Sequence, residues 1–171
     1  KAMTIEYFFW LTVSVCLMTV SAKGQIGKKE YESQFNEKYQ ENIEKEYLYG
    51  RYIPANDEEA IDEVDKLLAD EVRKRFLSLP DSLAGPKGVN TLGPWLLRNW
   101  NLYDGSRLSH YMKTEKGLSH PVDMVYYILT RYYRDQNNIP YDEDDLLSYI
   151  QERRKQLFLQ QVKDEEPGQK D

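Results

Sequence analysis

Apolar residues recur at helical spacing through most of this chain, and this pattern constrains its fold more than any other feature. Between residues 31 and 47 they stand four positions apart, at Tyr31, Phe35, Tyr39, Ile43 and Tyr47. Because each residue turns a helix by about 100°, such a spacing gathers the side chains on one broad face. No stretch of useful length alternates between apolar and polar residues, as a half-buried strand would. The sequence therefore predicts an all-α protein.

Proline and glycine divide the pattern into separate helices. Pro80 ends the second predicted helix, which begins at Asn56 or Asp57, and Pro121 opens the most apolar one. Glycine and proline are frequent between 80 and 94, so this segment is predicted to be a loop. The predicted helices cover residues 31–47, 56–79, 95–100, 106–112, 121–136 and 142–162.

With 171 residues, of which 40% are hydrophobic, the chain can bury a core without disulfides or metals. We expect a compact single-domain bundle at residues 23–162, with about four longer helices and two short ones around a centre rich in tryptophan. Residues 163–171 are polar, and a disordered tail is predicted there.

The segment from residue 7 to residue 22 is uncharged and mainly apolar, and Lys23 follows it directly. It is shorter than the roughly 20 apolar residues that a membrane-spanning helix needs, and it suits the apolar region of a signal peptide. Val20-Ser21-Ala22 places small residues at the expected cleavage site. The sequence predicts a signal peptide at 1–22 and export to the periplasm or cell envelope of a bacterium. The alternatives are that this segment is an uncleaved membrane anchor or a core helix. An uncleaved anchor is the only membrane contact that we expect for this chain.

The single cysteine, Cys16, lies within this leader. If the leader is removed, the mature chain has no cysteine, which excludes disulfides, thiolate nucleophiles and zinc bound by cysteine.

The formal net charge of -6 argues against a protein that binds nucleic acid, because phosphate backbones require a basic surface. Acidic residues gather at the start of the second predicted helix. Such a cluster is usually a solvated helix face, and the functional alternative is a docking surface for a basic partner. The residues of this candidate acidic docking face are Asp57, Glu58, Glu59, Asp62 and Glu63.

The segment from Trp95 to Tyr111 concentrates aromatic and polar residues and allows two interpretations. In the functional one, Trp95 and Trp100 form the walls of a pocket, and Arg98 and Arg107 bind an anion. In the structural one, which the sequence favours, both tryptophans are core anchors and the polar residues hydrogen-bond to the backbone of helix–loop junctions. The candidate binding residues are Trp95, Arg98, Asn99, Trp100, Asp104, Arg107 and His110.

The sequence contains no convincing catalytic set. His110 and His120 lack the spacing of a helical zinc pair, and we predict no metal site and no cofactor. Ser106 or Ser109 could be combined with His110 and with Asp104 or Asp123 into a triad, but no nucleophile-elbow motif supports it. His120 precedes a proline at a helix start, where a cap is more common than a base.

Several motifs of this region together resemble an uncharacterised family of small bacterial proteins, known only as a domain of unknown function. They are Trp95-Leu-Leu-Arg98-Asn99-Trp100, Ser106-Arg107-Leu108 and His120-Pro121-Val122-Asp123-Met124. The resemblance covers residues 53–138. It departs from the family at Val122, where an aspartate is expected, and at Val125, where a serine is usual. The family implies an all-helical fold and supplies no activity.

Acidity, export, small size and abundant tyrosine favour a protein that acts by binding another protein rather than by catalysis. The specific expectation is an inhibitor or immunity-type protein of the cell envelope that occludes a basic partner. The alternatives are an accessory subunit of an envelope complex, or a small hydrolase that uses Ser106, His110 and Asp104.

Overall fold

The computed structural model describes residues 30–165, and the predicted signal peptide at 1–22 lies outside them. Contacts divide the chain into two units, Lys1–Gln40 and Glu41–Asp171. In the first unit, the described residues 30–40 are helical, and this helix continues to residue 43. The helix predicted for 31–47 is therefore confirmed over most of its length.

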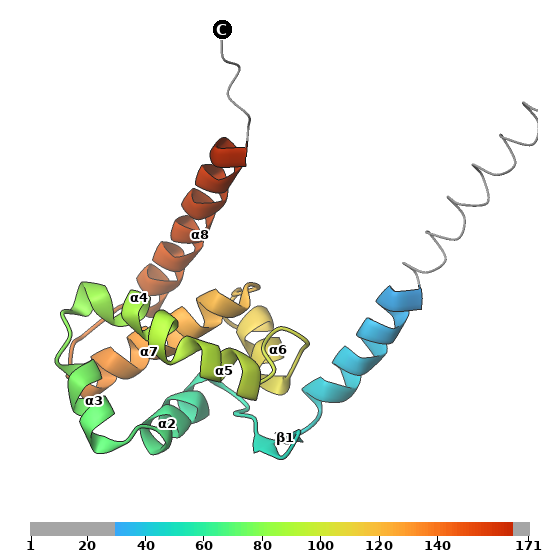
Figure 1. Ribbon diagram of the computed structural model, residues 1–171, viewed down its shortest axis with the longest axis horizontal. Helices are drawn as coiled ribbons and strands as arrows, with labels where there is room; N and C mark the ends of the chain where they lie inside the picture. The colour runs from blue at the N-terminus through green and yellow to red at the C-terminus, as the bar shows by residue number, and fades with distance from the viewer. Residues whose placement is uncertain (1–29, 166–171) are drawn as a thin grey trace, which may run out of the picture. The chain divides into compact units, whose positions relative to one another are not determined.

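The second unit contains a short hairpin followed by a bundle of helices, so the all-α prediction is confirmed (Figure 1). The elements are β1 (Tyr47–Leu48), β2 (Arg51–Tyr52), α2 (Asp57–Leu67), α3 (Asp70–Leu77), α4 (Asp81–Thr91), α5 (Gly93–Asn99), α6 (Arg107–Thr114), α7 (Pro121–Gln136) and α8 (Glu143–Glu165). Helix α8 continues to Glu165, so the first three residues of the predicted tail at 163–171 are helical, and the others lie outside the described residues.

Helix α7 is the centre of the bundle, and α2, α4, α5 and α8 all pack against it. Its side chains are buried around most of its circumference, as the sequence predicts for a helix that is apolar on several sides. Tyr127, Ile128, Leu129 and Tyr132 are fully buried. Pro121 occupies the first helical position, where its missing N–H costs nothing.

The first part of this unit differs from the sequence prediction in two places, at the end of the helix predicted for 31–47 and within the helix predicted for 56–79. Residues 47–52 form a two-stranded antiparallel hairpin, in which Tyr49 and Gly50 supply the positive φ angles that a tight turn requires. Its strands have only two residues each, too few to produce an alternating pattern. The helix predicted over 56–79 is two helices, because Leu68 and Ala69 have extended backbones between α2 and α3.

The predicted loop at 80–94 is also wrong, since residues 81–91 form α4. Pro86 removes one backbone donor from this helix, but tertiary packing compensates. Gly85 and Gly88 face α7 at very close range: a Cβ on Gly85 would lie 2.5 Å from the Tyr126 ring, and one on Gly88 2.9 Å from Leu129. These glycines shape the contact between α4 and α7 rather than a loop.

Candidate functional site

The two tryptophans predicted as core anchors occupy different environments. Trp100 is 2% exposed and belongs to the core with Leu96, as the structural interpretation predicts. Trp95 is 38% exposed and lines a surface hollow with Leu67 and Leu92, so its prediction as a core anchor is wrong. The tryptophans therefore do not form facing walls of one pocket.

The polar candidates around them mostly hold the backbone in place. The Asn99 side-chain amide donates to the Trp95 carbonyl at 2.9 Å, and Arg107 Nε donates to the Ile53 carbonyl at 2.6 Å. Arg98 and Asp104 line a separate cavity of about 430 Å³. The structure thus does not bring the seven candidate binding residues together into one site.

The serine of the hydrolase alternative has a structural role. Ser106 is fully buried and is the N-cap residue of α6, where its hydroxyl accepts from the Ser109 backbone N–H at 3.3 Å. The Ser109 hydroxyl accepts in return from the Ser106 N–H at 2.8 Å, which completes a capping box. A hydroxyl held in this way is not presented to a substrate.

The candidate acidic docking face is also divided by the structure. Asp57 points into the bundle and is 2% exposed, so the expectation of a solvated face is wrong for this residue. Glu59 accepts from the Tyr52 hydroxyl at 2.7 Å and from the Ala55 N–H at 2.8 Å, which joins the hairpin to α2. Glu63 pairs with Lys66 at 2.8 Å. The two other members, Glu58 and Asp62, are exposed and form no ion pair with the described residues.

Asp57 is the centre of a buried polar cluster. Its carboxylate accepts from the hydroxyl of Tyr111 at 2.7 Å and from that of Tyr127 at 2.9 Å. It also pairs with Lys116 Nζ at 3.2 Å and with the Arg131 guanidinium. A buried carboxylate is tolerated only when such donors replace its hydration.

Glu143, the first residue of α8, joins the same cluster. It pairs with Lys116 Nζ at 2.6 Å and lies within hydrogen-bond distance of the Tyr127 hydroxyl, whose single proton is shared between Glu143 and Asp57. Lys116 and Tyr127 therefore bridge Asp57 to Glu143, and they hold the first residues of α2 and α8 together.

These contacts determine which groups are charged. Burial by itself would raise the pKa of Asp57, but the hydrogen bonds from Tyr111 and Tyr127 and the charges of Arg131 and Lys116 lower it below its ordinary value. Hydrogen bonds from Lys116 and Tyr127 lower the pKa of Glu143. Burial alone would lower the pKa of Lys116. The hydrogen bonds and charges of Glu143 and Asp57 have the larger effect, so the pKa of Lys116 is raised above its ordinary value. All three side chains are therefore ionised at neutral pH.

The sequence analysis missed Tyr111, Lys116, Tyr127, Arg131 and Glu143 as members of a site. The weak signal that it contained was the spacing of Tyr127 and Arg131, which stand four residues apart and so share a helix face. The partners on α2, α6 and α8 are distant in sequence, and only the fold brings them together.

A second cluster surrounds the start of α7. Arg154 of α8 donates to both oxygens of Asp123, each at 2.7 Å. His120 caps α7, as its place before Pro121 predicts: its Nδ1 accepts from the Val122 N–H at 3.2 Å. Burial and the nearby Arg154 charge lower the pKa of His120. Asp123 thus fixes α8 on α7.

Among residues 30–165, no group of three His, Cys, Asp or Glu side chains is arranged to hold a metal ion. The helices of this part of the chain also include none that is long and apolar enough to cross a membrane.

A family model matches the central part of the chain. Residues 53–136 match the family described as a domain of unknown function, DUF6794. This match agrees with the resemblance to a domain of unknown function that the sequence motifs indicate. The DUF6794 segment includes α2 through α7 and the Asp57 cluster apart from Glu143, whereas α8 lies beyond it. No curated protein and no solved structure matches the chain.

Proposed function

We propose that the protein acts by binding a basic protein partner through an acidic surface at the starts of α2 and α8. The joined acidic surface consists of Glu58 and Asp62 on α2 and Asp144 on α8. The observation that carries this proposal is the bridge of Lys116 and Tyr127 between Asp57 and Glu143, which brings the two acidic helix starts together.

The acidic residues of the buried Asp57 cluster and those of the joined acidic surface have different roles. Asp57 and Glu143 are compensated by Lys116 and Arg131, so they hold the fold. Glu58, Asp62 and Asp144 are exposed and have no ion-pair partner in the part of the chain that the structure describes. Uncompensated exposed carboxylates attract a basic surface from a distance and accelerate its association.

The site of action in this proposal is the bacterial cell envelope, which the apolar segment 7–22 supports. There the protein would occlude its partner as an inhibitor or immunity-type protein, and an accessory subunit of an envelope complex is the alternative. The buried, backbone-bonded hydroxyl of Ser106 favours binding over the hydrolase alternative.

The test compares two variants with the same change in net charge. One neutralises the joined acidic surface (Glu58→Gln, Asp62→Asn, Asp144→Asn), and the control neutralises exposed acids elsewhere (Glu115→Gln, Asp164→Asn, Glu165→Gln). A partner is first captured with the wild-type protein from an envelope extract of the producing cells, and its association rate with each variant is then measured at low and high salt.

We expect a basic partner whose association at low salt slows by about tenfold for the surface variant and little for the control. The difference should shrink at high salt, because ions screen exposed charges. Equal slowing by both variants, or a partner with an acidic contact surface, contradicts the proposal.

A further inference from the structure

An apolar groove runs along the surface where α3 faces the end of α4 and the start of α5. It consists of two adjoining cavities of about 400 Å³ and about 240 Å³, which share Thr91 and Leu92 as lining residues. Helix α3 packs against α4, which packs in turn against α5 (Figure 1), so the groove is formed within one unit of the chain. The larger cavity alone lies within the range of small-ligand sites, about 300–1,000 Å³.

Large apolar side chains are exposed to solvent in both cavities. Leu67 and Trp95 line the smaller one and are 46% and 38% exposed, and Val72 lines the larger one and is 44% exposed. The buried side chains of Phe76 and Leu96 continue the apolar lining inward. Single exposed apolar residues are common on proteins, but a group of them around one hollow indicates a place where an apolar ligand or partner binds.

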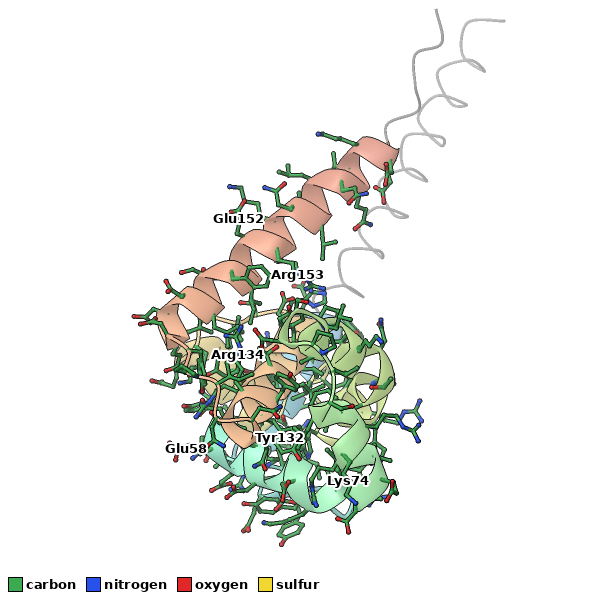
Figure 2. The ribbon with its side chains drawn as sticks, turned by 90° about the vertical axis from the view of Figure 1, so that its left-hand side faces the viewer. Glu58, Lys74, Tyr132, Arg134, Glu152 and Arg153 are labelled. Carbon is green, nitrogen blue, oxygen red and sulfur yellow. The ribbon has the colours of Figure 1, made fainter. Side chains whose placement is uncertain are left out.

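The larger cavity also has two cationic side chains. Arg75 of α3 and Lys87 of α4 line it, and neither forms an ion pair within residues 30–165. Lys74, the neighbour of Arg75, lies at the outer surface of α3 (Figure 2), where it pairs with Glu71 at 3.7 Å. No aspartate or glutamate of the described residues lines either cavity. The groove is therefore positive in a chain with a net charge of -6, and it favours an anion.

The smaller cavity has few polar groups. Thr91 is the one polar residue that lines it, and its hydroxyl already donates to the Lys87 carbonyl at 2.8 Å. A peptide in this part of the groove would bring backbone N–H and C=O groups that need partners. An alkyl chain has no polar group to satisfy, so the smaller cavity favours an alkyl chain over a peptide.

We propose that this groove binds the anion of a long-chain fatty acid. Arg75 and Lys87 bind the carboxylate, since guanidinium and ammonium groups form strong hydrogen bonds with carboxylates. The alkyl chain lies along Leu92 toward Leu67 and Trp95, where it covers apolar surface that water otherwise contacts. The groove shares no residue with the joined acidic surface, so this site does not depend on the proposed docking function.

The first experiment titrates the full chain with dodecanoate, below the concentration at which it forms micelles, and follows the indole N–H signal of Trp95 in NMR spectra. Comparison with the spectrum of Trp95→Phe assigns this signal. Hexanoate, which has the shorter chain, and dodecyltrimethylammonium, which has the opposite charge, are the comparison probes.

We expect a saturable shift of the Trp95 signal with dodecanoate. Hexanoate should bind about a hundredfold more weakly or worse, because it buries fewer methylene groups, and dodecyltrimethylammonium about tenfold more weakly. No saturable shift with dodecanoate, or equal affinity for the cationic probe, overturns the proposal. A shift of the signal with protein concentration alone also overturns it, because a second copy of the chain then occupies the groove.

The second experiment tests the cations by repeating the dodecanoate titration with variants that thermal melts confirm to be folded. Arg75→Gln combined with Lys87→Gln should weaken binding about tenfold, because the carboxylate loses both charged donors. The matched control combines Lys113→Gln with Lys163→Gln, which changes the net charge equally at exposed positions outside the groove. It should alter the affinity less than about twofold.

A second pair of variants tests the apolar lining. Leu67→Asn should weaken dodecanoate binding several-fold, since it places an amide against the alkyl chain. Its control is Leu159→Asn on α8, where the side chain is 43% exposed and outside the groove, and the affinity should stay unchanged. Equal losses in the groove variants and their controls indicate general attraction of an amphiphile, and unchanged affinity in both groove variants excludes the site; both results overturn the proposal.

Discussion

Replacing Asp57 by asparagine should destabilise the fold more than any single change at an exposed acid. The asparagine side chain keeps the size of aspartate but loses its charge. Tyr111 and Tyr127 then compete for one acceptor oxygen, and Arg131 loses its buried partner. Lys116 keeps Glu143 at 2.6 Å, whereas Arg131 keeps only a long contact of its Nε with Asp135 at 3.9 Å, so the charge of Arg131 is the less well compensated.

Removing one partner of a buried ion pair costs about 3–5 kcal/mol. The Asp57 side chain is 3% exposed, which places it in this class, and Arg131 at 17% recovers part of its hydration. We therefore expect Asp57→Asn to lower the free energy of unfolding by about 3 kcal/mol at pH 7. The assay is urea denaturation followed by circular dichroism. Its control is Glu58→Gln, one residue along and exposed, which should change stability by less than about 0.5 kcal/mol.

The stability that Asp57→Asn loses should decrease as the pH falls. The pKa values of Asp57 and Glu143 are lowered from 3.8 and 4.5 on folding, so the folded state binds fewer protons than the unfolded state in this range. The resulting stability is present above these ordinary values and is lost as the pH falls below them. The difference between wild type and Asp57→Asn should therefore narrow under acidic conditions. A loss below about 1 kcal/mol at pH 7, or a difference that does not depend on pH, would refute the assignment of Asp57 as a buried ionised anchor.

Two further predictions follow from the burial of Trp100 and the cap at His120. Trp100→Ala should lower the stability of the fold by about 3–5 kcal/mol, measured in thermal melts, because the ring is buried. Trp95→Ala should lower it far less, because that ring is half-buried at the surface. Equal losses of stability would contradict the assignment of Trp100 to the core. The lowered pKa of His120 means that the unfolded chain takes up a proton first, so stability should fall as the pH drops from above 6.5 toward the lower pKa of the folded state. His120→Asn keeps a capping side chain and should remove this pH dependence; an unchanged slope would exclude His120 as its source.

The parts of the fold that local pattern determines were predictable. Helix α7 follows from Pro121 and its dense apolar spacing, and the capping role of His120 follows from its place before that proline. Even the different fates of Trp95 and Trp100 are consistent with local geometry, since five helical residues turn the chain through about 140° from its starting direction. Two tryptophans at this separation do not lie on the same side of a helix.

The remaining features depend on contacts between distant segments. Glycines in α4 indicate a loop when taken alone, and they become favourable only because α7 packs within reach of their missing Cβ atoms. Asp57 stands among solvated acids in the sequence, and its burial depends on Tyr111 and Arg131, 54 and 74 residues away. Helical spacing places Asp57 on the same face of α2 as the buried Ile61 and Val64, but no local pattern supplies the distant partners that allow a carboxylate to be buried there.

Helix α8 is attached to the bundle along only its first half, and this has a consequence for its dynamics. Leu146, Ile150 and the pair of Arg154 with Asp123 anchor that half, and the residues beyond Arg154 are exposed (Figure 1). Isolated helices shorter than about 12 residues are marginal in water. The last turns can therefore open and close while the core stays intact, and their amide hydrogens should exchange with solvent long before those of α7. Arg154 marks the boundary between backbone protected by global stability and backbone protected only by its own helical turn.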